Sequence, residues 1–99
     1  MNDTENLFRK LAEQRGWELK HRGLPDFFCW KDGKIMFVEV KRKEDSPSKH
    51  QSLVMYYLEK HGIPCFIWRP GNNFPGVKFK DTQKKYFKNE ENWLYYLRS

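Results

Sequence analysis

Two short motifs carry the residues of this sequence that are best suited to metal-dependent chemistry. Pro25-Asp26 opens one apolar segment, and Glu39-Val40-Lys41 closes the next, with an Asp32-Gly33 turn between them. If the two segments pair as strands, two carboxylates and one lysine meet where the strands lie side by side. Two carboxylates bind Mg²⁺, and a lysine beside them acts on a metal-bound water or on a phosphate. The pattern therefore predicts a metal-dependent phosphodiesterase site.

Each of these residues also has an ordinary structural explanation. An aspartate after proline is a common turn former, which would account for Asp26. A glutamate among the apolar residues that precede Lys41 is poorly suited to a buried strand and needs a partner or a metal. An ion pair between Glu39 and Lys41 on one face would meet that need. The combination on two neighbouring strands favours the metal site.

Two more polar residues are candidates for the same site. Helical phase puts Glu5 on the side of Phe8 and Ala12, which faces the protein, although a capping box with Asn2 explains Glu5 equally well. Gln51 lies about one turn into the helix that follows the Glu-x-Lys strand, so helix entry brings it near the site. Ordinary exposed polarity is the alternative for Gln51.

The N-terminal half predicts one helix followed by three strands. Residues 3–15 have apolar side chains at helical spacing, and the strands are expected at 17–21, 26–30 and 35–41 with a hairpin turn at 31–34. Alternation along the third strand places Ile35, Phe37, Glu39 and Lys41 on one face. Glu39 and Lys41 are therefore expected to project together.

The C-terminal half predicts a second helix, a fourth strand and two short elements. Ser46-Pro47 indicates an N-cap and a first helical residue, and the helix is expected to run to about residue 60. Its expected core face is Leu53, Val54, Tyr57 and Leu58. A strand at 64–69 after this helix implies a parallel, right-handed crossover. A short strand at 77–79 and a helix at 89–98, with Trp93, Leu94 and Leu97 inward, complete the chain.

These elements predict the α/β class, with a small mixed β-sheet flanked by helices, in one domain over residues 1–99. The longest apolar run, residues 53–58, is far too short to cross a membrane, and the polar N-terminus is unlike a signal peptide. Cys29 and Cys65 lie in apolar segments and are expected to be reduced core residues, although a disulfide stays open. We therefore expect a cytoplasmic protein.

The chain has 19 Lys and Arg residues against 13 Asp and Glu residues, which gives a net charge of +6. This balance suits a polyanion such as DNA, because phosphate attraction supplies affinity that is independent of sequence. Taken singly, each basic residue is better explained as a solvated surface charge. The basic residues near the predicted site, which are candidate DNA contacts, are Lys20, Arg22, Lys31, Lys34, Arg42, Lys43 and Lys49.

Gly23-Leu24-Pro25-Asp26, the segment 37–41 and Ser48-Lys49-His50-Gln51 resemble the PD-(D/E)xK nuclease superfamily. Within it, the chain is similar to the virus-type replication-repair nuclease domain, VRR-NUC, over residues from about 5 to 69. The resemblance implies a restriction-endonuclease-like core, dependence on Mg²⁺ or Mn²⁺, and DNA substrates that are branched or structured, such as four-way junctions or flaps. It also implies a homodimer. The compact domain suggests a viral or bacterial origin, and we therefore expect the protein in a bacterial or phage-infected cell.

The resemblance also implies a role for each motif residue. Asp26 and Glu39 would be the metal-binding carboxylates, and the main-chain carbonyl of Val40 would be a further ligand. Lys41 would position or polarise the attacking water. Glu5 would match the acidic residue of the family's first helix, touching the metal directly or through water, and Gln51 would match the helix glutamine that supports the site.

Two other classes of function compete with a nuclease. A non-catalytic nucleic-acid-binding module would keep the basic surface and use Glu39 and Lys41 as an ion pair. An accessory protein would bind another protein through the aromatic segment 93–97. Tyr95 and Tyr96 in this segment fit a dimer interface, or they pack on the domain's own core with their hydroxyl groups at the rim.

Overall fold

The hairpin that carries both motifs is the centre of the sheet. In the computed structural model, which describes residues 1–83 and 90–99, strands β2 (Phe27–Lys31) and β3 (Lys34–Val40) are antiparallel, with Phe27 opposite Val38 and Lys31 opposite Lys34. Asp32 and Gly33 close the turn with φ angles of 51° and 78°. A two-residue turn of this hand needs positive φ at both positions, which aspartate and glycine tolerate. The predicted hairpin is confirmed.

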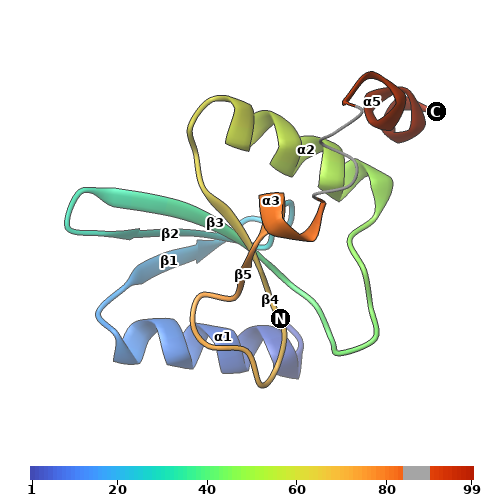
Figure 1. Ribbon diagram of the computed structural model, residues 1–99. Helices are drawn as coiled ribbons and strands as arrows, with labels where there is room; N and C mark the ends of the chain where they lie inside the picture. Colours follow the sequence, from blue (N-terminus) through green and yellow to red (C-terminus); the bar gives the residue numbers. More distant parts are fainter. Residues whose placement is uncertain (84–89) are drawn as a thin grey trace.

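The sheet contains five strands in the order β1-β2-β3-β4-β5. Strand β1 (Glu18–His21) is antiparallel to β2, while β4 (Cys65–Trp68) is parallel to β3 and antiparallel to β5 (Val77–Lys78). Helix α2 (Lys49–Lys60) connects β3 to β4. Helices lie on both faces of the sheet, as Figure 1 shows. The α/β class, the mixed sheet and the parallel crossover are confirmed.

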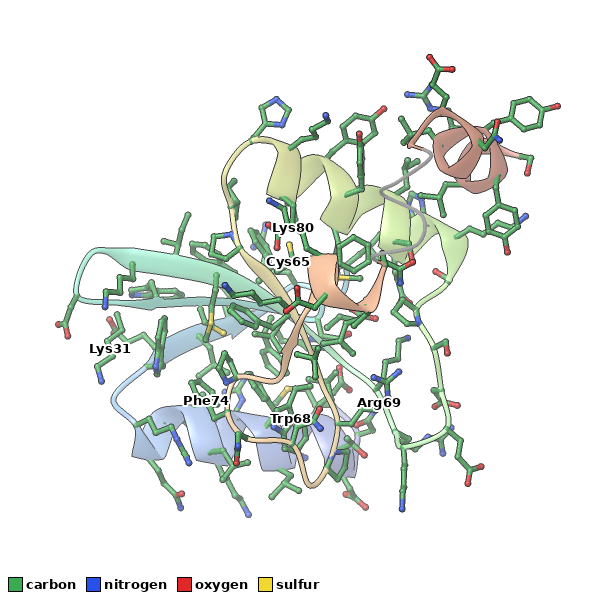
Figure 2. All side chains as sticks on the ribbon, in the orientation of Figure 1. Lys31, Cys65, Trp68, Arg69, Phe74 and Lys80 are labelled. Atoms are coloured by element: carbon green, nitrogen blue, oxygen red, sulfur yellow. The ribbon has the colours of Figure 1, made fainter. Side chains whose placement is uncertain are left out.

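Helix α1 (Asp3–Gln14) covers one face of the sheet and builds the first half of the core. Phe8 and Ala12 of α1 pack against Val38 and Trp68, all of them buried. Trp68 and Phe74 lie between the sheet and α1 in Figure 2, and the Phe74 ring stacks on that of Phe8 with centroids 5.5 Å apart. The residues of β3 that pack on this face alternate with those that the sequence predicts for the other face.

Helices α2, α3 (Phe79–Thr82) and α5 (Glu90–Arg98) belong to the opposite side, where Met55, Ile67 and Phe79 form the second half of the core. Helix α5 packs on α2, and its Leu97 is buried there. Figure 1 shows α5 at the edge of this layer, away from the sheet.

Cys29 and Cys65 are buried on opposite sides of the sheet, one in each half of the core, and both are free thiols. The disulfide that the sequence left open is therefore absent. Burial raises the pKa of each thiol to about 12. Both residues are inert core side chains at neutral pH, as expected.

The second helix departs from its prediction in two ways. It begins at Lys49 with Ser48 as the N-cap, not at Ser46-Pro47, because Ser48 and Gln51 form a reciprocal capping box. Its buried residues are Ser52, Met55 and Tyr56.

The expected core face of that helix, Leu53, Val54, Tyr57 and Leu58, lies at its margin or in solvent, and the Tyr57 side chain is 38% exposed. Apolar residues run almost all round this helix, so the spacing alone selects no single face. Phe79 begins α3 instead of ending the fifth strand. The last helix is confirmed from Glu90, while residue 89 and the Trp93 side chain lie outside the described residues.

Gly76, which directly precedes β5, lies against the backbone of β4, and this close contact can be tested by mutation. Its φ is +115°, and an added Cβ would overlap the Ile67 carbonyl oxygen and lie 2.8 Å from the carbonyl carbon. Gly62 has a φ of +80° with nothing within 4 Å of an added Cβ. We expect Gly62→Ala to lower the free energy of unfolding by about 1–2 kcal/mol through φ strain alone, and Gly76→Ala to lower it clearly more. Urea denaturation of both variants measures the difference, and equal losses would contradict the close contact.

Candidate active site

A cavity of about 620 Å³ opens where the hairpin meets the first turns of α1 and α2. All five predicted site residues line it: Glu5, Asp26, Glu39, Lys41 and Gln51. Glu5 comes from α1, Asp26 directly precedes β2, Glu39 lies in β3, Lys41 directly follows β3, and Gln51 is in α2. The fold thus brings together side chains that are far apart in sequence.

Two hydrogen bonds between side chain and backbone lock Asp26 to Glu39. The backbone N–H of Asp26 donates to Glu39 Oε1 at 3.1 Å, and the backbone N–H of Val40 donates to Asp26 Oδ2 at 2.8 Å. The pairing of Phe27 with Val38 places these residues next to each other at the end of the ladder. Each carboxylate is therefore held by the backbone of the other motif.

Glu39 is a carboxylate with no exposed surface, and Lys41 is its charged neighbour. Lys41 Nζ lies 3.1 Å from Glu39 Oε2, and the two side chains form an ion pair. Burial, and then the charge of Asp26, raise the pKa of Glu39 to about 7. Burial raises the pKa of Asp26 as well, with a smaller contribution from Glu5. Lys41 therefore compensates the negative charge of this group only in part, which favours a bound cation.

Glu5 is committed to two contacts. Its Oε1 accepts from the backbone N–H of Asn2 at 3.0 Å, and Asn2 Oδ1 accepts from the N–H of Glu5 at 2.8 Å, so the capping box is present. Its Oε2 lies 2.7 Å from His21 Nε2. Burial alone would raise the pKa of Glu5, but the hydrogen bonds from Asn2 and His21 outweigh it, and the pKa is lowered. Glu5 is thus held ionised at the rim of the cavity.

His21 is a site residue that the sequence analysis does not single out. It ends β1 opposite Phe27, which places it beside Asp26. One ligand atom from each of Glu5, His21 and Asp26 lies within 4.8 Å of the others. The signal that would find His21 is strand register, because no spacing of histidines along the chain marks it.

The Gln51 side chain lines the cavity through its place in the capping box. Its Oε1 accepts from the backbone N–H of Ser48 at 2.8 Å. Gln51 therefore fixes the start of α2 beside the Glu-x-Lys motif, and its carbonyl oxygen is already engaged.

Four of the seven basic candidates divide between two places. Arg42 lines the cavity and forms an ion pair with Asp45 at 3.1 Å, and Lys43 is next to it in the same exposed segment. Arg69, labelled in Figure 2, donates to the carbonyl oxygen of Asp45 and tethers this segment to the end of β4.

Lys31 and Lys34 lie instead at the turn of the hairpin, the end opposite Asp26 and Glu39. Lys31 Nζ donates to the carbonyl oxygen of Arg15 at 2.6 Å. The structure therefore does not bring these two lysines to the cavity. The remaining candidates, placed by their elements, are Lys20 in β1, Arg22 directly after it, and Lys49 at the start of α2 with Nζ 4.3 Å from the centre of the Tyr96 ring.

Comparison with known families identifies the chain. Residues 2–70 match the family model of the VRR-NUC domain, a stretch that contains all five predicted site residues and strands β1 to β4. The chain belongs to the VRR-NUC family. It is therefore a nuclease, with DNA as its substrate class, and the family expected from the sequence is confirmed. No curated protein matches the chain. Among the described residues, none of the helices has the length and apolar character to cross a bilayer.

The cavity of this VRR-NUC domain suits a hard divalent cation. Asp26 and Glu39 supply carboxylate oxygens, and Val40, which also lines the cavity, has a main-chain carbonyl oxygen. Such oxygen donors are the ligands that Mg²⁺ and Mn²⁺ prefer. The observation that speaks most directly for a cation is the fully buried Glu39 carboxylate, which lies beside the carboxylate of Asp26 and has Lys41 as its charged neighbour.

The raised pKa of Glu39 gives a test in the metal-free protein. In the unfolded chain Glu39 ionises near 4.5, whereas in the folded protein it ionises near 7. Between these values the unfolded state loses its proton first, so this group lowers stability as the pH rises from about 4.5 to about 7. We expect Glu39→Gln to remove that fall, so that the stability of the variant relative to the wild type increases over this pH range.

Urea denaturation in EDTA at pH 4.5 and pH 8 measures this difference, with exposed Glu44→Gln as the control. Addition of Mn²⁺ at pH 8 is expected to stabilise the wild type and to stabilise Glu39→Gln less. If the stability of the wild type and of Glu39→Gln depended on pH in the same way, the raised pKa of Glu39 would be contradicted.

Proposed function

We propose that this nuclease is a divalent-metal-dependent DNA endonuclease that holds Mg²⁺ or Mn²⁺ through Asp26, Glu39 and the main-chain carbonyl of Val40. The observation that carries the proposal is the buried Glu39, which is hydrogen-bonded to the Asp26 backbone, close to Lys41, and short of positive charge. A buried carboxylate in this state is best explained by a cation that completes its environment.

The residues of the cavity have distinct parts in phosphodiester hydrolysis. The cation, when bound, lowers the pKa of a water ligand and polarises the scissile phosphate. Lys41 directs its ammonium group into the same cavity, where it orients the attacking water and offsets the charge that develops on the phosphate. Glu5 would hold the cation directly or through water, and Gln51 supports the site by fixing the start of α2.

We propose DNA recognition by shape. The basic candidates nearest the cavity, Arg42 and Lys43, lie in the exposed segment between β3 and α2, where they would follow a phosphate backbone. The sequence has no recognition-helix or zinc-finger signature for reading bases. Branched or structured DNA, such as four-way junctions or flaps, is therefore the substrate that we propose.

A homodimer with two active sites would suit such substrates, because two strands would be cut in one complex. Tyr95 and Tyr96 are 79% and 54% exposed on α5. The outer side of α2 also has an apolar depression of about 400 Å³. Exposed aromatic and apolar surface of this kind favours an interface.

We also propose the cytoplasm of a bacterial or phage-infected cell as the location of the protein. The two free thiols agree with this location, because the cytoplasm keeps cysteines reduced.

A non-catalytic nucleic-acid-binding module is the second candidate. The contact between Lys41 and Glu39, at 3.1 Å, is the ion pair that this candidate predicts. It leaves unexplained why Asp26 and Glu39 are placed together with raised pKa values.

The decisive experiment compares cleavage of linear, flapped and four-way-junction DNA in Mg²⁺, Mn²⁺ and EDTA. We expect Glu39→Gln and Lys41→Met to lower the single-turnover cleavage rate by about 100-fold or more, because each removes a group that stabilises the transition state. Exposed Glu44→Gln and Lys10→Met are the matched controls and are expected to cleave like the wild type. DNA binding without cleavage in every metal would favour the non-catalytic module.

Salt dependence of DNA binding tests the basic segment. In EDTA, Arg42→Gln/Lys43→Gln is expected to reduce the slope of log K against log salt by about 1.8, because each phosphate contact contributes about 0.9. Lys31→Gln/Lys34→Gln removes the same charge at the far end of the hairpin and is expected to change the slope less. Fluorescence anisotropy with a labelled junction measures both slopes. Equal slopes for the two variants would mean that net charge, and not position, sets the affinity.

A further inference from the structure

The hairpin carries apolar side chains on the face of the sheet opposite α1 that the core does not fully take up. Phe28 and Trp30 of β2 are half-buried, and Ile35 of β3 is 43% exposed. Among the described residues, neither half of the core includes any of these three side chains. On this face α2 packs on β4, and Figure 1 shows the turn of the hairpin reaching well past α2. Together with Phe37, which borders the core, these residues form a surface that we call the hairpin patch.

The aromatic rings of the hairpin patch form a continuous row. Phe28 lies opposite Phe37 across the two strands, and the centroids of their rings are 5.2 Å apart. The rings of Phe28 and Trp30 have centroids 5.4 Å apart. Trp30 Nε1 donates a hydrogen bond to Glu18 Oε2 at 2.8 Å, which fixes the indole ring. The row is therefore ordered by its own contacts before any partner binds.

This row leads to the cavity of the two carboxylates. Because side chains of a strand alternate between faces, Phe37 and Glu39 lie on the same face of β3, two residues apart. On the neighbouring strand, Asp26 likewise lies two residues before Phe28. Two residues of a strand span about 7 Å. The patch is therefore continuous with the candidate active site, one such step away from it.

The surroundings of the hairpin patch favour DNA as its occupant. Lys20 of β1 is exposed and lies opposite Phe28, so its ammonium group is available to a phosphate beside the rings. Glu18, the acidic neighbour at the other end of the row, is engaged by the indole of Trp30. DNA is also the substrate class of the family. Aromatic side chains bind the π faces of bases, which a base offers fully only when it is not stacked within a duplex.

We propose that the hairpin patch is a stacking platform for unpaired bases, and that it favours DNA with a single-stranded arm next to the bond that is cut. The inference rests on the proposed function and narrows its substrate class. Phe28 and Trp30 supply the stacking faces, and Lys20 contacts the backbone of the arm. A flapped DNA has such an arm, whereas a fully paired four-way junction does not. Flapped DNA is therefore the preferred substrate.

A second copy of this chain is the other occupant that an apolar patch would suit. Leucine separates the two occupants, because it keeps the apolar character of the side chain and has no π face. Phe28→Leu and Trp30→Leu are therefore the test variants, and Phe28→Tyr keeps an aromatic ring. Phe66→Leu is the matched control, because Phe66 is a half-buried aromatic residue of β4 that packs on the α1 side of the sheet.

Fluorescence anisotropy in EDTA tests the proposal with three labelled probes: flapped DNA with an oligothymidine arm, the same DNA with an abasic arm, and a blunt duplex. The abasic arm keeps every phosphate and lacks only the bases. We expect the wild type to bind the thymidine arm about tenfold more tightly than the abasic arm.

The variants are expected to separate by the same comparison. Phe28→Leu and Trp30→Leu should each lose about fivefold or more in affinity for the thymidine arm, and less than about twofold for the abasic arm and the duplex. Phe28→Tyr and Phe66→Leu should bind all three probes like the wild type. Thermal unfolding shows whether each variant is folded, and Trp30→Leu serves if Phe28→Leu is not.

Two results would overturn the proposal. Wild-type affinity of both leucine variants for the thymidine arm would show that the rings do not stack on bases. Equal losses on the thymidine and abasic arms would show an effect that does not depend on bases. In the first case, a dimer that dissociates in Ile35→Ser, as measured by sedimentation, would assign the hairpin patch to a second copy of the chain.

Binding in EDTA keeps this proposal apart from the nuclease mechanism. If the wild type cuts DNA in no metal but prefers the thymidine arm through Phe28 and Trp30, the proposed function fails and the stacking platform stands. If the wild type cuts flapped DNA and both leucine variants bind and cut it equally well, the platform fails and the proposed function stands.

Discussion

The site depends on one reciprocal constraint: each of its two central carboxylates is hydrogen-bonded to the backbone of the other motif. Asp26 fixes the N–H of Val40, and Glu39 fixes the N–H of Asp26. Burying two carboxylates opposes folding, and Lys41 offsets only part of that cost. The strands therefore hold two carboxylates beside one lysine, and the proposed cation would offset the remaining negative charge.

The hairpin and the grouping of Asp26, Glu39 and Lys41 were predictable from sequence, because turn chemistry and the two-residue period of strands act locally. Glu5 was placed correctly by helical phase. The competition between its capping role and a metal role follows from local sequence too, and the capping contact is present. These features need only neighbours along the chain or across one tight turn.

The rest depends on contacts between distant segments. His21 enters the site because β1 pairs with β2 in one register, and nothing in its neighbours along the chain specifies that register. Helix α2 has apolar residues nearly all round, so packing against the sheet and α5, not periodicity, chooses its buried face. Lys31 and Lys34 are close to the motif in sequence but are carried to the opposite end of the hairpin by the strands themselves.

The turn at Asp32-Gly33 sets the geometry of a site that lies a whole strand away from it. Successive residues of β3 face opposite layers, so one residue inserted between the turn and Glu39 would send that carboxylate toward α1 and put an apolar residue in the cavity. Two residues inserted into each strand would leave every side chain on its present face of the sheet and would only lengthen the hairpin. Related chains with the same chemistry should thus differ in hairpin length by matched, even steps, and an odd step should coincide with a bulge that restores the phase.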